Sequence, residues 1–390
     1  SGNVYTAEAT LYKDAAKIPS MHVLVLNQAV GEDSPANDVA PAVDGNNNSR
    51  ATGNDYIEDT THGIRIYAET SEGGSIGNVD LAADNNFTIK GGGTYSVHGT
   101  WEPQKGSNGE IIAANDLPVI TIKGPGEFRI VLGDQLALNT IANGAAKPLI
   151  KVSGGAVVEL MSQGGYMGCK KEGVSKYAAL LVESGSTVEI TEGNTAKDFI
   201  INGVIWNEGT LVVKKNTKEV VVDNGAVVNY GKMQVGIFDE KASTGSGAGA
   251  WFPGKLSIGS DGYFLNAAGE LTIGNSSAVT VDGSTVGAQV SNANGFTNSG
   301  NLKVVEDKST LIVKGASFEN QGKIVVGEEK SDKEGKEGKI IANRQFINVG
   351  EIIVGKKGTL QVDGSLTNSK QLTVKGWTVP EPSTGDKEDG

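Results

Sequence analysis

The sequence predicts an all-β fold in which short strands follow one another as stacked coils. Three observations lead to this prediction: glycine is very frequent, apolar residues alternate with polar ones, and a short motif recurs along the chain. Glycine contributes 55 of the 390 residues, about twice its usual share of roughly 7%. Turns must therefore be frequent. Alternation with a period of two is typical of strands, and helical spacing is nowhere sustained.

The composition also excludes several classes of protein. Asp and Glu number 46 against 34 Lys and Arg, so the formal net charge is −12. Affinity for nucleic acid comes largely from basic side chains, so this acidic chain is not expected to bind nucleic acid or an anionic lipid surface. No run approaches the ~20 apolar residues of a membrane-spanning helix, so we expect no membrane insertion. Cys169 is the single cysteine, which excludes an internal disulfide and predicts a buried thiol.

Residues 1–80 lack the repeat and are predicted to form an irregular N-terminal cap, because an exposed solenoid end has to be covered. Gly31–Asp59 is dense in Asn, Asp, Pro, Ser and Gly and is predicted to be loop. Met21–Leu26 and Gly63–Tyr67 are the strand candidates that flank it. The chain begins without Met, so we expect that an export signal or a lipid anchor preceded it.

Residues 81–376 are predicted to form the solenoid, which starts with coils of longer period. Similar segments begin at Val119, Leu149 and Leu180, 30 and 31 residues apart, and each is followed by a second alternating strand. These coils are expected to carry an extra strand or a longer loop. Phe87–Gly91 fits the same pattern and marks the earliest coil.

The C-terminal half repeats at a period of about 21 residues. Each repeat has an apolar residue two before an Asn, usually a Gly two after it, and then alternating apolar positions. The seven asparagines are Asn207, Asn229, Asn266, Asn298, Asn320, Asn348 and Asn368. A unit this short cannot bury both faces alone, so neighbouring coils must stack with their strands parallel.

Three of the intervals between these asparagines are lengthened by insertions, and insertions in repeats map to loops. They are Thr244–Ala250, Gly287–Gly295 and Glu328–Gly338. After the last repeat, residues 377–390 are Pro-rich and charged, and this tail is predicted to be disordered.

The Asn/Gly turns and the short coils resemble the right-handed parallel β-helix family, which includes pectate lyase-like enzymes and bacterial surface adhesins. The resemblance covers the solenoid region, and it implies the right-handed winding that β crossover connections also prefer. Residues 15–18, which precede an alternating strand, resemble the start of the sheet in Bacteroidetes fimbrillin-type domains.

The recurring asparagines are predicted to have a structural role. Asn tolerates left-handed backbone conformations and hydrogen-bonds within its own turn. In a parallel stack, equivalent side chains lie above one another and can form an internal ladder. We predict that the ladder consists of Asn207, Asn229, Asn298, Asn320 and Asn348.

Aromatic residues supply the candidate ligand-binding positions. Trp251 and Phe252 follow the Gly/Ser-rich insertion, and Trp101 is predicted to lie in a loop after His98. Exposed aromatic rings of this kind stack on sugars or contact protein partners. The alternative is that they pack over the solenoid flank. Trp206 lies inside a strand pattern and is predicted to be packed.

No catalytic residue, metal ligand or cofactor is predicted. Enzymes of the resembled fold set carboxylates and a basic residue on an outer face, but the four arginines, at positions 50, 65, 129 and 344, form no recognisable motif. Calcium is the one plausible metal, because Asp and Asn oxygens suit it. Its richest patches, Asp44–Asn48 and Asp55–Asp59, match no known calcium motif and are interpreted as solvated loop.

These features predict a secreted or cell-surface, adhesin-like solenoid that presents a binding face to an extracellular glycan or a surface protein. The alternative is a polysaccharide lyase or glycoside hydrolase of the pectate lyase-like type. A third interpretation is a purely structural element that uses its exposed ends or edges to contact partners.

Overall fold

The computed structural model describes thirteen segments of the chain. They are residues 55–59, 64–68, 78–81, 87–101, 120–138, 149–162, 166–169, 178–192, 198–214, 219–239, 249–284, 295–327 and 336–375. The strand candidate Met21–Leu26, the calcium candidate Asp44–Asn48 and the tail at 377–390 lie outside these segments.

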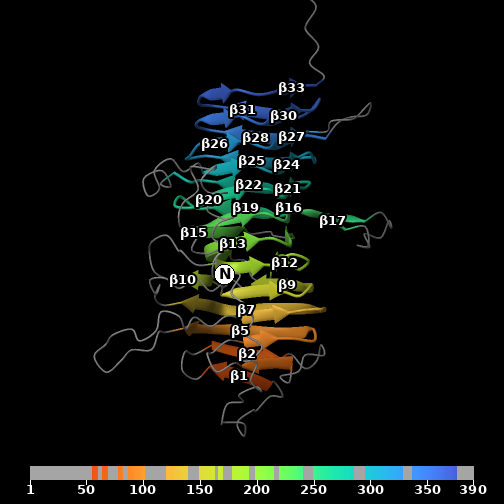
Figure 1. The fold of residues 1–390 in the computed structure, drawn as a ribbon, viewed down its shortest axis with the longest axis vertical. Coiled ribbons are helices and arrows are strands. Elements are labelled where there is room, and N and C mark those ends of the chain that lie inside the picture. Colours follow the sequence, from red (N-terminus) through yellow and green to blue (C-terminus); the bar gives the residue numbers. More distant parts are fainter. Residues whose placement is uncertain are drawn as a thin grey trace, which may run out of the picture.

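Within the described residues, the protein is an all-β parallel solenoid, as the sequence predicts. One continuous sheet of 31 strands winds into successive coils, and β17 and β18 form a separate two-stranded hairpin. The coils stack along the long axis of the molecule, from β1 at one end to β33 at the other (Figure 1). Each regular coil contributes three strands, so the strands form three parallel columns.

The first column opens each regular coil, and its strands pair in parallel from one coil to the next. It contains β10 (Tyr166–Cys169), β19 (Lys255–Ile258), β22 (Ala278–Val281), β25 (Ser309–Val313), β28 (Gly338–Ala342) and β31 (Thr359–Val362), with the C-terminal parts of β5 (Gly93–Trp101) and β7 (Gly126–Leu138) and the N-terminal parts of β13 (Phe199–Asn207) and β15 (Val220–Asn229).

The second column carries the asparagines. It contains β4 (Phe87–Ile89), β6 (Ile120–Lys123), β8 (Ile150–Ser153), β11 (Ala178–Val182), β20 (Tyr263–Asn266), β23 (Phe296–Asn298), β26 (Phe318–Asn320), β29 (Phe346–Asn348) and β32 (Leu366–Asn368), with the C-terminal parts of β13 and β15.

The third column closes each coil. It contains the N-terminal parts of β5 and β7, β9 (Ala156–Ser162), β12 (Thr187–Glu192), β14 (Thr210–Val213), β16 (Lys232–Val235), β21 (Glu270–Ile273), β24 (Asn301–Val304), β27 (Lys323–Val326), β30 (Glu351–Val354) and β33 (Leu372–Val374).

The core is a thin column of apolar side chains enclosed by the three strand columns. Alternate residues of each strand point inward, so the strands show the buried and half-buried alternation that the sequence predicts. Phe264, Phe296, Phe318 and Phe346 occupy equivalent positions in successive coils and are fully buried. Their ring centroids lie 4.5 to 5.1 Å apart, about one strand spacing.

Stacked glycines allow the turns after the second column to approach closely. A Cβ atom built on Gly322 would lie 2.1 Å from the carbonyl oxygen of Gly300, and one on Gly350 would lie 2.1 Å from that of Gly322. No side chain fits at these distances, so the glycine of the recurring motif is a packing requirement of the stacked coils.

The described part of the N-terminal region changes strand direction at the end of the solenoid. β1 (Asp55–Asp59) pairs antiparallel with β2 (Ile64–Ala68), and β2 pairs antiparallel with β5. β3 (Val79–Leu81) pairs antiparallel with β4. The prediction of loop at Asp55–Asp59 is therefore wrong. Its Asp and Glu residues suggested loop, but pairing with the apolar alternation of β2 makes it a strand.

Candidate functional site

The candidate site is the hairpin formed by β17 (Ile237–Asp239) and β18 (Ala250–Phe252), which projects from the solenoid flank (Figure 1). It leaves the solenoid after β16 and returns before β19. The two strands are antiparallel, and Phe238 lies directly opposite Trp251. The insertion predicted at Thr244–Ala250 thus contributes the start of β18, and residues 240–248 lie outside the described segments.

Close backbone packing holds the base of the hairpin. The chain leaves at Gly236, whose φ of +79° favours glycine, and a Cβ there would lie 2.0 Å from Oγ of Ser277. The chain re-enters at Gly254, whose N–H donates a 3.1 Å hydrogen bond to the same Ser277 Oγ. A Cβ on Gly254 would lie 2.3 Å from the carbonyl oxygen of Val213. The base of the hairpin is therefore held by the turn before β22, which contains Ser277, and by the end of β14, which contains Val213.

Phe238 and Trp251 form an aromatic pair on one face of the hairpin. Their ring centroids lie 5.3 Å apart at an interplanar angle of 52°. Phe238 is 40% exposed, which is unusual for so large an apolar side chain, and Trp251 is half-buried. A Cβ on Gly274 would lie 3.0 Å from Cζ3 of Trp251, so the indole rests on the turn that follows β21.

Trp251 and Phe252, the two neighbouring residues predicted to bind a ligand, lie on different faces of the hairpin. Successive side chains of a strand point to opposite faces, so Phe252 lies opposite Ile237 and on the other face from Trp251. Sequence reasoning missed Phe238, the actual partner. The signal was the apolar pair Ile237–Phe238 a few residues before the insertion, because an insertion between two coils can close as a hairpin.

Polar groups flank the aromatic pair. The turn after Gly274 contains Asn275 and Ser276, and Ser276 Oγ donates a 2.7 Å hydrogen bond to Asn275 Oδ1 near the surface. Ser276 has a φ of +54°, the left-handed conformation that tight turns impose. An aromatic surface with amide and hydroxyl groups beside it can stack on the C–H face of a sugar and hydrogen-bond its hydroxyls, or it can bind an apolar side chain of a protein.

Trp101 belongs to a different part of the molecule. It lies at the end of β5, opposite Leu138 of β7, and not in a loop as predicted. The strand continues through His98 because its residues pair with both β2 and β7. Five coil-to-coil steps separate β5 from β16, or about 24 Å at 4.8 Å per step. Trp101 and Trp251 therefore do not share a site.

Trp206 is fully buried on the outer side of the second column. Its ring lies 5.1 Å from that of Tyr230, and its Nε1–H donates a 3.0 Å hydrogen bond to Glu208 Oε1. The prediction that Trp206 is packed is confirmed.

The structure also brings together a row of charged side chains on the outer face of the third column. Arg129, Glu159 and Glu189 occupy equivalent positions of β7, β9 and β12. Arg129 Nε contacts Glu159 Oε2 at 2.8 Å, and Lys214 forms an ion pair with Glu189. Sequence reasoning missed this row, although its members are spaced 30 residues apart, the period of these coils.

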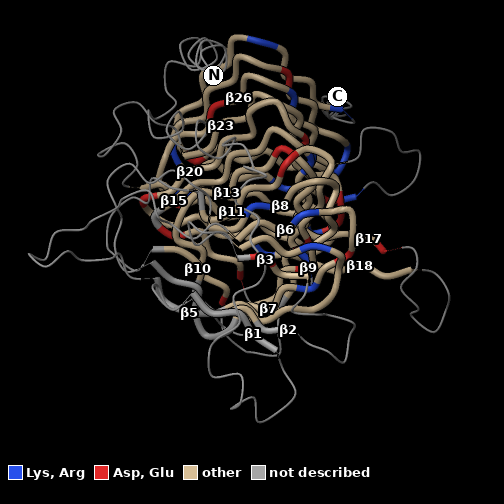
Figure 2. Tube along the Cα trace, turned by 60° about the horizontal axis from the view of Figure 1, so that its bottom comes forward, with Lys and Arg blue, Asp and Glu red and all other residues tan. Residues whose placement is uncertain are grey.

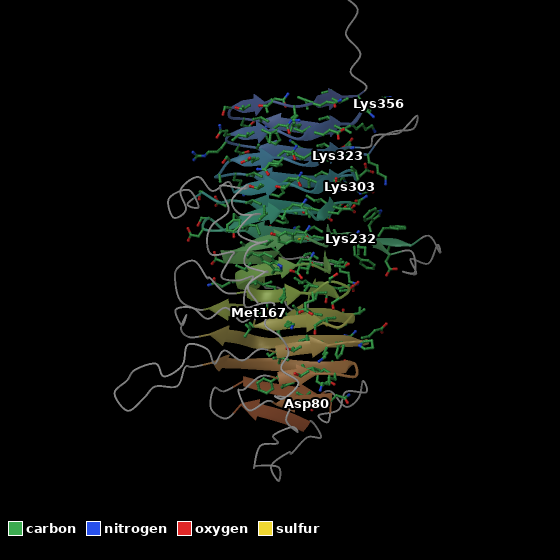
Figure 3. The ribbon with its side chains drawn as sticks, viewed as in Figure 1. Asp80, Met167, Lys232, Lys303, Lys323 and Lys356 are labelled. Atoms are coloured by element: carbon green, nitrogen blue, oxygen red, sulfur yellow. The ribbon has the colours of Figure 1, made fainter. Side chains whose placement is uncertain are left out.

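Farther along the same column, lysines again face carboxylates. Lys303 Nζ lies 2.9 Å from Glu270 Oε2, and Lys323 Nζ lies 3.5 Å from Glu351 Oε2. Lys232, Lys303 and Lys323 follow one another along this side of the molecule (Figure 3). Charged residues of both signs are scattered over the coils rather than gathered in one patch (Figure 2).

The asparagine side chains point into the core and are fully buried from Asn207 to Asn348. Each Nδ2 donates to Oδ1 of the next asparagine at 2.7 to 2.8 Å, in the order Asn207, Asn229, Asn266, Asn298, Asn320, Asn348 and Asn368. The series includes Asn266 and Asn368, which the predicted ladder left out. These amides stabilise the stack and are closed to any ligand.

Within the described segments, no three His, Cys, Asp or Glu side chains come together in an arrangement that could hold a metal ion. The same segments contain no helix that is long and apolar enough to span a membrane. Comparisons with protein-family models, with curated protein sequences and with solved structures find no match for this chain.

Proposed function

We propose that this protein is a secreted or cell-surface, adhesin-like solenoid without catalytic activity, and that it binds an extracellular glycan or surface protein through the β17–β18 hairpin. The observation that carries the proposal is the aromatic pair: Phe238 is 40% exposed at 5.3 Å from Trp251. Exposed aromatic surface of this kind is enriched where proteins bind partners.

The attachment of the hairpin supports the proposal. Gly236, Gly254 and Ser277 fix its base on the stacked coils, so the strands that bear the rings start from an ordered backbone. A preorganised aromatic surface loses little conformational entropy on binding, which favours affinity. The solenoid body in turn provides a long support from which the hairpin projects (Figure 1).

A glycan-array screen of the full chain, with and without calcium, tests the proposal. Trp251→Ala and Phe238→Ala should each weaken binding by about tenfold, equivalent to ~1.4 kcal/mol. Phe252→Ala is the matched control, because Phe252 lies on the opposite hairpin face and its loss should change affinity much less. Equal losses for all three variants, or none, would contradict the assignment of this face. If no glycan binds, the same three variants are compared in a screen of surface proteins.

A second candidate is polysaccharide cleavage, which the row of Arg129, Glu159 and Glu189 favours. Two carboxylates one coil apart beside a guanidinium group are the residue types that such chemistry uses. Product analysis on polysaccharides that bind the chain separates the two candidates. Products that disappear in Glu159→Gln and Glu189→Gln would establish an enzyme and overturn the non-catalytic proposal.

A further inference from the structure

The last coil of the described solenoid has an exposed end. Leu366 is 47% exposed, whereas Phe346, its equivalent one coil earlier, is fully buried. Val374 is 55% exposed against 6% for Val354, and Leu372 is 38% exposed against 1% for Ile352. The positions that form the core in every preceding coil therefore form an apolar surface here, which we call the C-terminal face.

The backbone of this face is also open. Among the described residues, β31, β32 and β33 each pair with a strand of the preceding coil and with none beyond. Open strand edges with apolar side chains are templates for pairing with another chain.

The asparagine series ends at the same face. Asn368 accepts a hydrogen bond from Asn348 at 2.7 Å, but within the described segments its own side-chain nitrogen has no partner. In every preceding member, from Asn207 to Asn348, that nitrogen donates to the next asparagine. Asn368 is exposed, so water can accept the hydrogen bond of this last nitrogen.

The slope of the face would allow a second copy to fit onto it. A solenoid climbs by about 4.8 Å per coil, so β33 stands higher than β31 at this end. A two-fold axis through β32 places the raised β33 of one copy over the recessed β31 of the other. The same axis sets all facing strands antiparallel, which allows their free edges to pair.

Two opposite charges lie on either side of β32, through which the two-fold axis passes. Asp363 lies in the turn between β31 and β32, and Lys370 lies in the turn between β32 and β33. Both are exposed, and the two-fold axis brings each beside the other residue of the second copy. Two opposite-charge pairs then form across the interface.

We propose that the C-terminal face binds the C-terminal face of a second copy of this chain, forming a closed two-fold dimer joined end to end. An isologous contact of this kind stops at two copies, whereas a head-to-tail contact would continue into an open series. The dimer would place the ends labelled by Asp80 at its two extremes and those labelled by Lys356 at its centre (Figure 3).

Sedimentation equilibrium of the full chain over a range of concentrations tests the proposal. The wild type should show a monomer–dimer equilibrium with no larger species. Asp363→Lys and Lys370→Glu should each weaken the dimer about tenfold or more, because each reversal creates two like-charge contacts. The double variant, Asp363→Lys with Lys370→Glu, should restore the dimer. Lys339→Glu, a charge reversal one coil away on the outer face, is the control and should leave it unchanged.

Three outcomes would overturn the proposal. An open series of oligomers would indicate head-to-tail contacts. A dimer that the double variant fails to restore would place the interface elsewhere. A wild type that stays monomeric, while a chain ending at Lys375 dimerises, would show that the residues after Lys375 cover the face of their own chain.

Discussion

The side-chain nitrogen of Asn298 donates a hydrogen bond to Oδ1 of Asn320 at 2.8 Å, and both amides are fully buried. The same nitrogen lies 3.2 Å from the carbonyl oxygen of Lys323, a group that can only accept. The orientation of the amide is thus fixed by the backbone as well as by its neighbour. Every member of the series therefore points the same way along the solenoid axis.

Removal of one amide should break this series. We expect Asn320→Ala to lower the free energy of unfolding by about 1 to 3 kcal/mol, because Asn298 loses the acceptor of one of its two buried amide hydrogens. Asn348 Oδ1 also loses its 2.7 Å donor and keeps only the 3.3 Å contact with the Gly350 N–H. Denaturant-induced unfolding measures the change. Gln321→Ala, at an exposed neighbouring position, should stay within about 0.5 kcal/mol. A change of similar size in both variants would contradict the role of the series.

The phenylalanine stack should be a major contributor to stability. Phe318 is fully buried between Phe296 and Phe346, so Phe318→Ala should cost about 3 to 5 kcal/mol. Phe238→Ala removes the same side chain from a 40% exposed position and should cost less than about 1.5 kcal/mol. Chemical denaturation of both variants gives the comparison, and equal losses would argue against the buried stack.

The glycine turns should not tolerate a side chain. A Cβ on Gly322 would lie 2.1 Å from the carbonyl oxygen of Gly300, which belongs to the backbone of the preceding coil and cannot rotate away. We expect Gly322→Ala to cost more than about 2 kcal/mol in thermal or chemical unfolding. Val349→Ala changes an exposed residue of the equivalent turn and should have little effect.

The charged row on the third column should contribute little to stability. Arg129 and Glu159 are 44% and 32% exposed, so their ion pair is screened by solvent. Glu159→Gln is expected to change the free energy of unfolding by less than about 1 kcal/mol. A melting curve checks this, and a large loss would mean that the variant cannot serve in the cleavage assay.

The repeat is predictable from the sequence because each coil needs the same residue types at the same positions. An inward apolar position and an asparagine recur in each repeat, usually with a closely packed glycine. The seven asparagines of the motif are the seven members of the hydrogen-bonded series, of which Asn207 to Asn348 are fully buried. The parallel stacking followed from the shortness of the unit, and the structure confirms it.

The candidate site was less predictable because it depends on register across segments that the repeat does not constrain. Phe238 meets Trp251 only when the insertion closes as a hairpin. Arg129, Glu159 and Glu189 become neighbours only when three coils are aligned. The segment around Trp101 lacks the motif and therefore predicts a loop, whereas the pairing of β5 with β7 extends the strand through Trp101.

Because each coil adds the same rise, the number of coils sets the distance of the hairpin from each end of the solenoid. Five coil-to-coil steps separate β16, from which the hairpin departs, from β33, which corresponds to about 24 Å along the axis. Each coil contacts only its neighbours. The gain or loss of one coil would therefore move the hairpin by about 4.8 Å relative to one end of the solenoid and leave its aromatic face intact. A change in the number of repeats would thus change the distance between the hairpin and either end of the solenoid, without any change in the sequence of the hairpin.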